Sequence, residues 1–363
     1  MARQEYINFI LNGMTFLRYS IPLTIEASSR GIKSRYFIHA TAKDSSPFTD
    51  RNYKIINEYS KIYNFEIFDS SRANDFEGTF FLIENTGLEY LSEKHKKISI
   101  TYMTDFHSLY PKYIDKVDNV IFPSEHMARY YDTISPKNLY LGSPKYDMEL
   151  DEKEILDKYN IPDLKNILIV APKMREAVER EEEVLAALRS YAYAANEMGH
   201  RLLIKTRKKD SFNTEKFKKW FGNICEYMYF EDESWYQHTT MELIKVSKLA
   251  LNFGSTTIKE CVMLDTPVIN FDIKPQIRHG KDLGKYRLGM SYLYDQKYCY
   301  NATSPSTNTG ATIALSEMMS NDWSSEFSKA RKKYLFEGNS SKRILDYLEK
   351  SSNNTCPRRL YPA

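Results

Sequence analysis

The segment Leu249–Asn270 has the residue types and the spacing of an anion site. An apolar run predicts a strand over Leu249–Phe253, and a helix is predicted over Thr256–Met263. Between them lies a small, hydroxyl-rich turn of Gly254, Ser255, Thr256 and Thr257. Free N–H groups at a helix start, the helix dipole and hydroxyl groups together bind anions such as a nucleotide diphosphate. Glu260, about one turn into the helix, is placed to accept hydrogen bonds from a ribose diol. The same residues would also serve as an ordinary helix cap, and this segment alone does not decide between the two readings.

A second candidate is the pair Asp105 and His107, which follows the predicted strand Ile98–Tyr102. Residues two positions apart leave a strand on the same face if the extended conformation continues. Histidine is the usual general base near neutral pH, and a neighbouring carboxylate raises its basicity. We therefore expect His107, or Asp105, to act as a catalytic base, with a purely structural histidine as the alternative.

Cations and small residues gather at other strand ends. Lys205 and Arg207 close the predicted strand Arg201–Thr206, where they would bind phosphate, although a solvated basic face would look the same. The long segment after Phe271 is a candidate substrate lid. Further candidate contacts to a donor or an acceptor are Gly142, Pro144, Lys145, Asp147, Arg278, His279, Asn12 and Gly13. The turn containing Gly142 and Asp147 could equally be a plain interdomain connection.

The order of apolar runs and amphipathic stretches along the chain predicts the strands and helices that position these residues. Such alternation favours βαβ units with parallel sheets. In the first half, the predicted strands are Tyr6–Leu11, Ser34–His39, Phe65–Phe68, Thr79–Glu84, Ile98–Tyr102, Asn119–Phe122 and Asn138–Leu141. In the second half, they are Asn166–Ala171, Arg201–Thr206, Tyr227–Phe230, Leu249–Phe253 and Pro267–Phe271.

The charged stretch Leu150–Leu164, which contains Pro162, separates the two patterns. We therefore predict an α/β protein with two Rossmann-like, doubly wound domains that face each other across a cleft. The predicted division is a first domain at 1–150, a second domain at 151–335, a C-terminal helix at 336–351 that crosses back to the first domain, and a flexible tail at 352–363.

The bulk composition narrows the functional classes. The chain has 363 residues, enough for two domains, with 42% hydrophobic and 27% charged residues. A net charge of +3 gives no reason to expect a nucleic-acid partner. The four cysteines are widely spaced, which argues against a zinc site and for reduced thiols. The apolar stretch near the N-terminus is too short for a signal peptide or a membrane span, so we expect a cytoplasmic protein.

Taken in order, the motifs resemble the GT-B superfamily, in particular CDP-glycerol glycerophosphotransferases and capsule-sugar transferases, and more distantly UDP-N-acetylglucosamine 2-epimerases. The segment Gly254–Glu260 followed by Thr266-Pro267-Val268 is similar to a Ser-Ser-x-x-x-Glu and Thr-Pro-Val pattern of that family. Gly142–Asp147 resembles Gly-x-Pro-Arg-x-Asp, with Lys145 in place of Arg. Gly338–Ile344 resembles a C-terminal Gly-x-x-Ser-x-Arg-Ile.

Other parts of the chain depart from the family pattern. The stretch Thr104–His107 lies where a Trp-His-Gly is usual, so only His107 carries over, as the base. The histidine of a Lys-Pro-His-Pro motif is absent at Ile204–Arg207. The resemblance implies that 1–150 is the acceptor domain and 151–335 the nucleotide-donor domain, with phosphate contacts at Ser255 and Thr256 and a ribose contact at Glu260.

The resemblance implies transfer of a sugar or polyol-phosphate from a CDP-, CMP- or UDP-linked donor to a hydroxyl of a glycan or lipid-linked acceptor. No Asp-x-Asp pair is present, so we expect no obligate metal or other cofactor. Two alternatives remain: a nucleotide-sugar epimerase or hydrolase, and a catalytically idle nucleotide-binding protein. Segments that mix aromatic and basic residues, Phe217–Phe221 and Phe327–Leu335, are compatible with peripheral membrane contact or with ordinary amphipathic packing.

Overall fold

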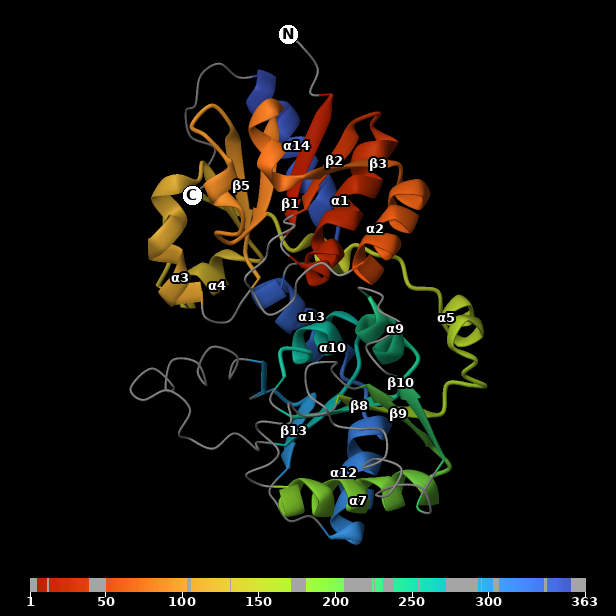
Figure 1. The fold of residues 1–363 in the computed structure, drawn as a ribbon. Helices are drawn as coiled ribbons and strands as arrows, with labels where there is room; N and C mark the ends of the chain where they lie inside the picture. Colours follow the sequence, from red (N-terminus) through yellow and green to blue (C-terminus); the bar gives the residue numbers. More distant parts are fainter. Residues whose placement is uncertain are drawn as a thin grey trace. The chain divides into compact units, whose positions relative to one another are not determined.

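The computed structural model divides the chain into two compact units. Unit 1 combines residues 1–148 with residues 333–363, and unit 2 is residues 149–332. The residues that the structure describes are 5–11, 13–38, 50–102, 106–130, 132–170, 181–205, 224, 226–230, 238–253, 255–271, 293–294, 296–302, 307–335 and 338–353. Both units are Rossmann-like, as the sequence predicts (Figure 1).

Unit 1 is built on a parallel sheet of seven strands in the order β3-β2-β1-β4-β5-β6-β7. The strands are β1 (Tyr6–Leu11), β2 (Lys33–Ile38), β3 (Phe65–Asp69), β4 (Thr79–Ile83), β5 (Lys96–Ile100), β6 (Asn119–Phe122) and β7 (Asn138–Tyr140). The central strands are apolar on both faces because helices cover both sides of a doubly wound sheet. The strand order reverses between β1 and β4, which makes their carboxyl ends the topological switch point of unit 1.

Helices cover this sheet, and the last of them comes from the far end of the chain. They are α1 (Leu17–Ser29), α2 (Asp50–Tyr63), α3 (Phe106–Tyr113), α4 (Glu125–Tyr130) and α14 (Ser340–Asn353). Helix α14 buries Ile344, Leu345 and Leu348, a helical spacing that gives it one apolar face. It lies alongside α1 in Figure 1, blue beside red.

Unit 2 is built on a parallel sheet of six strands in the order β10-β9-β8-β11-β12-β13. They are β8 (Asn166–Val170), β9 (Arg201–Lys205), β10 (Tyr227–Phe230), β11 (Leu249–Asn252), β12 (Val268–Phe271) and β13 (Cys299–Ala302). The order reverses between β8 and β11, so the turn after β11 lies beside the switch point of this sheet.

The helices of unit 2 are α5 (Glu152–Tyr159), α7 (Glu181–Glu197), α9 (Thr239–Lys245), α10 (Ile258–Met263), α12 (Asn308–Ser320) and α13 (Ser324–Ala330). A π-helical segment, Arg331–Leu335, follows α13. Helices α7 and α12 pack together and cover the hydrophobic core that includes Leu188, Tyr191 and Leu315 (Figure 1).

Two segments of unit 2 hold elements that the sequence patterns do not predict. Strand β13 and helix α12 follow Phe271 in the chain, while residues 272–292, which belong to the candidate lid, lie outside the described residues, so the lid stays a prediction. The second segment is Leu150–Leu164, where the domain boundary is predicted. It holds helix α5, which begins where the Asp151 carboxylate accepts the Glu154 N–H at 2.9 Å.

The segment Phe327–Leu335 uses its aromatic residues for packing. Phe327 is buried and stacks on Tyr298 with ring centroids 4.7 Å apart, and Tyr334 is buried as well. This favours the amphipathic-packing interpretation for this segment, while Phe217–Phe221 lies outside the described residues. None of the described helices has the length and apolar character needed to cross a membrane.

Candidate functional site

The turn after β11 carries the hydroxyl groups that the sequence singles out. The Ser255 and Thr257 hydroxyl oxygens lie 3.0 Å apart, and the Thr257 N–H points to the Ser255 hydroxyl at 3.4 Å. Ser255 is half-buried and Thr256 is exposed, whereas Thr257 is buried. Thr257 stands at the start of α10 and makes no side-chain cap hydrogen bond, whereas the Ser255 hydroxyl accepts the N–H two positions further on, as a cap does. The helix-cap alternative for Ser255 therefore stays open beside the anion site.

Two side chains, of which one is fully buried and the other half-buried, donate to the Ser255 carbonyl of this turn. Asn252, the last residue of β11, is fully buried, and its amide group donates to the Ser255 carbonyl at 3.3 Å. The Tyr294 hydroxyl donates to the same carbonyl at 2.6 Å. Burial raises the pKa of Tyr294 well above its usual value, so its hydroxyl keeps its proton at neutral pH. Both hydrogen bonds fix the turn through its Ser255 carbonyl. The Ser255 and Thr257 hydroxyl groups of the turn lie at the carboxyl edge of the sheet.

Glu260 lies in α10 as predicted, but only 4% of its surface is exposed. Its charge contributes to raising the pKa of the adjacent Cys261 thiol, after burial, which has the larger effect. Cys261 is therefore a neutral, buried thiol. A ribose contact at Glu260 stays a prediction, and it requires the ligand to reach a largely covered carboxylate.

Lys205 is the last residue of β9, two strands from β11 in the sheet, and its side chain is buried. A cation at this end of the strand lies on the same edge of the sheet as the Ser255 turn. The remaining predicted residues of this group lie outside the described part of the chain: Gly254, Arg207, Arg278 and His279.

In unit 1, Gly13 comes two positions after the end of β1, which borders the switch point, and it begins a short 3-10 turn. Asn12 lies outside the described residues. The neighbouring strand β4 is followed by Glu84, whose backbone adopts a positive φ of 55°. Glu84 is 6% exposed, and its carboxylate accepts the Tyr102 N–H at 3.3 Å. A buried carboxylate on left-handed backbone at a switch point is a feature of functional sites.

The extended conformation that would bring Asp105 and His107 to one face does not continue to His107. Strand β5 ends at Ile100, and His107 lies in the first turn of helix α3. The helix forms because Tyr110 and Tyr113, three positions apart, are both buried on one side. Asp105 and the His107 side chain lie outside the described part, so the catalytic base stays a prediction.

The Gly142–Asp147 turn contacts helix α14. The Asp147 carboxylate accepts the Ser340 N–H at 3.0 Å and also accepts the Ser341 N–H. Gly142 has φ +89°, and a Cβ there would lie 2.2 Å from the Ser340 hydroxyl oxygen. Arg343 donates to the Leu141 carbonyl at 3.2 Å. The two sequence motifs at Gly142–Asp147 and Gly338–Ile344 therefore bind each other within unit 1.

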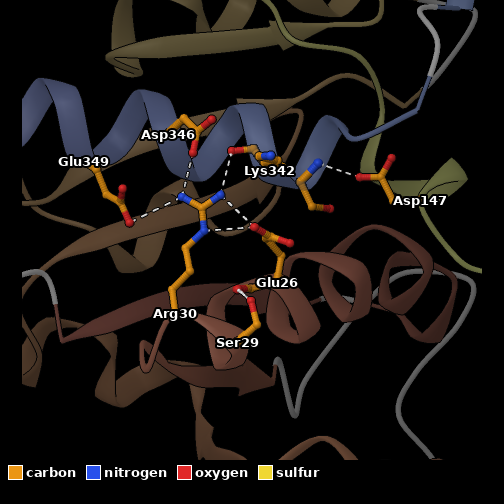
Figure 2. A network of polar contacts seen from close by, with 8 residues as sticks. Glu26, Ser29, Arg30, Asp147, Lys342, Asp346 and Glu349 are labelled. Carbon is orange, nitrogen blue, oxygen red and sulfur yellow. Dashed lines mark hydrogen bonds and ion pairs between the residues drawn. The ribbon is translucent and has the colours of Figure 1, made fainter.

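Arg30, at the end of α1, forms ion pairs with helix α14. Its guanidinium group donates to Glu26 at 2.7 Å, to Asp346 at 2.7 Å and to the Lys342 carbonyl at 3.2 Å, and it pairs with Glu349 at 3.3 Å (Figure 2). Figure 2 also shows Asp147 at the start of α14. Pro144 and Lys145 belong to the same turn, and the Lys145 side chain is buried.

Three residues of these sites have no counterpart among the sequence-based candidates: Glu84, Asn252 and Tyr294. Asn252 carried a usable signal, since a polar residue at the end of an apolar strand beside the switch point is unusual in a buried core. Tyr294 carried none, because it meets the turn from 39 positions away.

No known family model matches the chain, and no curated protein sequence matches it. Solved structures do match. UDP-N-acetylglucosamine 2-epimerase of Methanocaldococcus jannaschii gives a TM-score of 0.62 at 12% identity, covering 95% of this chain and 99% of that one. The wall teichoic acid polymerase TagF gives 0.59 at 13%, covering 96% and 89%. Phytolacca americana UGT2, complexed with UDP-2-fluoroglucose and pterostilbene, gives 0.58 at 11%, covering 96% and 100%.

The chain has the GT-B fold. The two parallel sheets, with seven and six strands, and the match over nearly the whole length support this assignment. A glycosyltransferase and an epimerase are thus both among the solved structures that share this architecture. Within the described residues, no group of three or more His, Cys, Asp or Glu side chains is arranged to hold a metal ion.

Proposed function

We propose that this GT-B protein is a glycosyltransferase. It moves a sugar or polyol-phosphate from a CDP-, CMP- or UDP-linked donor to a hydroxyl of a glycan or lipid-linked acceptor. The observation that carries the proposal is the turn Ser255–Thr257. It presents hydroxyl groups beside the switch point of the unit 2 sheet, which is where ligands bind in doubly wound folds.

In this proposal, His107 or Asp105 takes the proton of the acceptor hydroxyl, whose oxygen attacks the donor. The bond to the nucleotide breaks, and its electrons leave with the phosphate. Ser255, Thr256 and Lys205 stabilise the negative charge that develops there, together with Arg207. Protein cations and N–H groups balance this charge, so the proposed reaction is metal-independent.

The structural relatives support a nucleotide donor. UGT2 is complexed with a UDP-sugar, and the M. jannaschii epimerase has been solved with UDP-N-acetylglucosamine and UDP. The likeness to TagF favours a surface-polymer acceptor, in line with the sequence motifs.

A nucleotide-sugar epimerase is the second candidate, favoured by the likeness to the M. jannaschii enzyme and by the buried carboxylate of Glu84 at the unit 1 switch point. Such a reaction moves protons at a sugar carbon and needs acid–base groups close to it. NMR of the protein with each UDP- and CDP-sugar separates the two candidates. An epimerase converts the donor alone, whereas a transferase consumes it only when an acceptor is added.

The first test is a thermal-shift panel with CMP, CDP, UDP, GDP and ADP, each with and without Mg²⁺. A ligand at 100 times its Kd adds about 2.7 kcal/mol of stability, which raises the Tm of a unit this size by roughly 5–10 °C. Ser255→Ala and Glu260→Gln should weaken the response, while Ser320→Ala, at the exposed end of α12, should leave it unchanged. If no nucleotide shifts the protein at millimolar concentration, the donor site is refuted.

A further inference from the structure

Glu84 follows strand β4 and is joined to the end of strand β5 at three points. Its N–H donates to the Ile100 carbonyl at 3.1 Å, and its carbonyl accepts the Ser99 hydroxyl at 2.9 Å. Its carboxylate accepts the Tyr102 N–H at 3.3 Å. The first two bonds use the main chain, so they do not require a glutamate. What the glutamate side chain adds is the bond to Tyr102, two positions beyond the end of β5.

The position of this carboxylate is fixed by the turn that carries it. Glu84 has a φ of 55°, which is uncommon for a residue with a side chain, and only 6% of its surface is exposed. Gly87, in the same turn, has a φ of 82°, and a Cβ there would collide with the Ile10 side chain of β1. A buried side chain keeps such a backbone conformation only where the surrounding structure enforces it. The turn thus holds the Glu84 carboxylate at one place beside the switch point of the unit 1 sheet.

The segment from Tyr102 to Tyr113 is held at both ends. At its start, the Tyr102 ring meets Phe16 edge-on with ring centroids 5.6 Å apart, and the Tyr102 N–H is bound by Glu84. At its end, Tyr113 is buried; burial raises the pKa of its phenol, and the charge of Glu84 also raises it. The Glu84 carboxylate therefore acts on both ends of the segment. His107 lies between them, in the first turn of α3.

We propose that Glu84 is a positioning residue for the catalytic base: its carboxylate fixes Tyr102 and, through it, the chain that leads to Asp105 and His107. This inference rests on the proposed function, which assigns the base to one of those two residues. A base must lie within hydrogen-bond reach of the proton that it takes, and a displacement of about 1 Å can slow a reaction about 100-fold. The Glu84 side chain acts through Tyr102 and is not itself the group that takes the proton.

Two substitutions separate the reach of this side chain from its charge. In Glu84→Gln the charge is lost, but an amide oxygen at the same distance can still accept the Tyr102 N–H. In Glu84→Asp the charge stays and the side chain is one methylene shorter, while aspartate tolerates a positive φ. A positioning role predicts that Glu84→Gln keeps the activity and that Glu84→Asp loses it. The matched control is Glu89→Ala, which removes an exposed carboxylate from the same connection after β4 and should change nothing.

The assay follows the release of UDP or CMP by phosphorus NMR from UDP-glucose, UDP-N-acetylglucosamine and CDP-glycerol, with glycerol as the acceptor. The kcat and the KM for the donor are measured on the full chain, and the Kd of the free nucleotide is measured by calorimetry. Glu84→Asp should lower kcat about 30- to 100-fold. The KM and the Kd should not change, because the donor is proposed to bind in unit 2. Glu84→Gln should stay within about fivefold of the wild-type kcat, since a neutral acceptor makes a weaker hydrogen bond than a charged one.

Each outcome decides a separate question. If the wild type releases no nucleotide from any of these donors, the proposed function fails and this inference fails with it. If Glu84→Asp keeps the wild-type kcat, only the positioning role is overturned. A loss in Glu84→Gln as large as in Glu84→Asp would mean that the carboxylate itself reacts, and it overturns the positioning role too, as does a rise in KM and Kd that matches the fall in kcat. Should Glu84→Asp not fold, Glu84→Ala, which leaves no buried charge in the turn, takes its place, and an unchanged kcat in that variant refutes the proposal.

Discussion

Replacing Arg30 by Met should loosen helix α14 from unit 1, because one guanidinium group joins the two ends of the chain. Its side chain is only 16% exposed, and it contacts three carboxylates and one carbonyl. Methionine keeps much of the apolar stem but removes every one of these bonds. Glu26, Asp346 and Glu349 would then repel one another without a shared cation.

The magnitude follows from the exposure of the partners. The side chains of Asp346 and Glu349 are 41% and 50% exposed, so each pair contributes at most about 1 kcal/mol. The bond to the Lys342 carbonyl adds about 1 kcal/mol. We therefore expect Arg30→Met to lower the free energy of unfolding by about 2–3 kcal/mol. Arg30→Lys, which keeps the charge and loses the planar fork, should lose about half of that.

The assay is urea unfolding followed by circular dichroism, at low salt and in 1 M NaCl. The control is Arg129→Met, whose ion pair with Glu125 is exposed on both sides and should be worth less than about 0.5 kcal/mol. Salt should narrow the gap between wild type and Arg30→Met, because screening weakens the ion pairs. The reasoning is refuted if Arg30→Met unfolds at the same urea concentration as the wild type, or if its loss equals that of Arg129→Met.

Three further predictions concern stability, all read by urea unfolding. Gly142→Ala should lower the free energy of unfolding by about 2–4 kcal/mol, because the φ of Gly142 is positive and a Cβ there would collide with Ser340. Gly31→Ala also has a positive φ but open space around it, so it should lose about 1 kcal/mol, and equal losses in the two variants would contradict the clash. Glu242→Gln should destabilise unit 2 by about 1–2 kcal/mol, because the buried Glu242 carboxylate accepts a hydrogen bond from Lys158 at 3.0 Å. A loss of less than about 0.5 kcal/mol would show that this ion pair does not stabilise the unit. Burial and the nearby Lys333 lower the pKa of His126 in the folded protein. The stability that the neutral imidazole contributes is therefore complete above the pKa of 6.5 that His126 has in the unfolded chain, and it is lost as the pH falls. Between pH 7 and pH 5, His126→Gln should lose less free energy of unfolding than the wild type, and parallel pH profiles would refute this.

The sequence predicts the strands of both sheets well wherever they are apolar. The run Asn166–Val170 is buried along its whole length, and such runs are unambiguous. Strand β13 escapes prediction because it lies at the sheet edge, where Tyr300 and Asn301 are exposed and leave no apolar pattern. Helix α12 escapes because its solvent face carries the apolar Ile313 beside Ser316 and Ser320, with Glu317 as its one charged residue, so no amphipathic pattern marks it.

In the candidate site, residues that form a local sequence pattern can be predicted, whereas residues that join the site through long-range contacts cannot. Ser255 and Thr257 can be predicted, because a hydroxyl-rich turn after an apolar strand is a local pattern. Tyr294 could not be, since its contact with Ser255 exists only once β13 has paired with β12. The Gly142–Asp147 motif was recognisable as a turn, but its contact with Ser340 spans 193 positions and depends on the fold.

The discontinuity of unit 1 sets the order in which this protein can mature on the ribosome. Residues 149–332 form a unit from one uninterrupted stretch, so unit 2 can fold as soon as that stretch has emerged. Unit 1 must wait, because Arg30 finds its partner Asp346 only after another 316 positions have been translated. Until then the apolar face of α1 that receives α14 is uncovered. We expect nascent chains that stall before Ser340 to depend on chaperones, although every strand of both sheets has already been made.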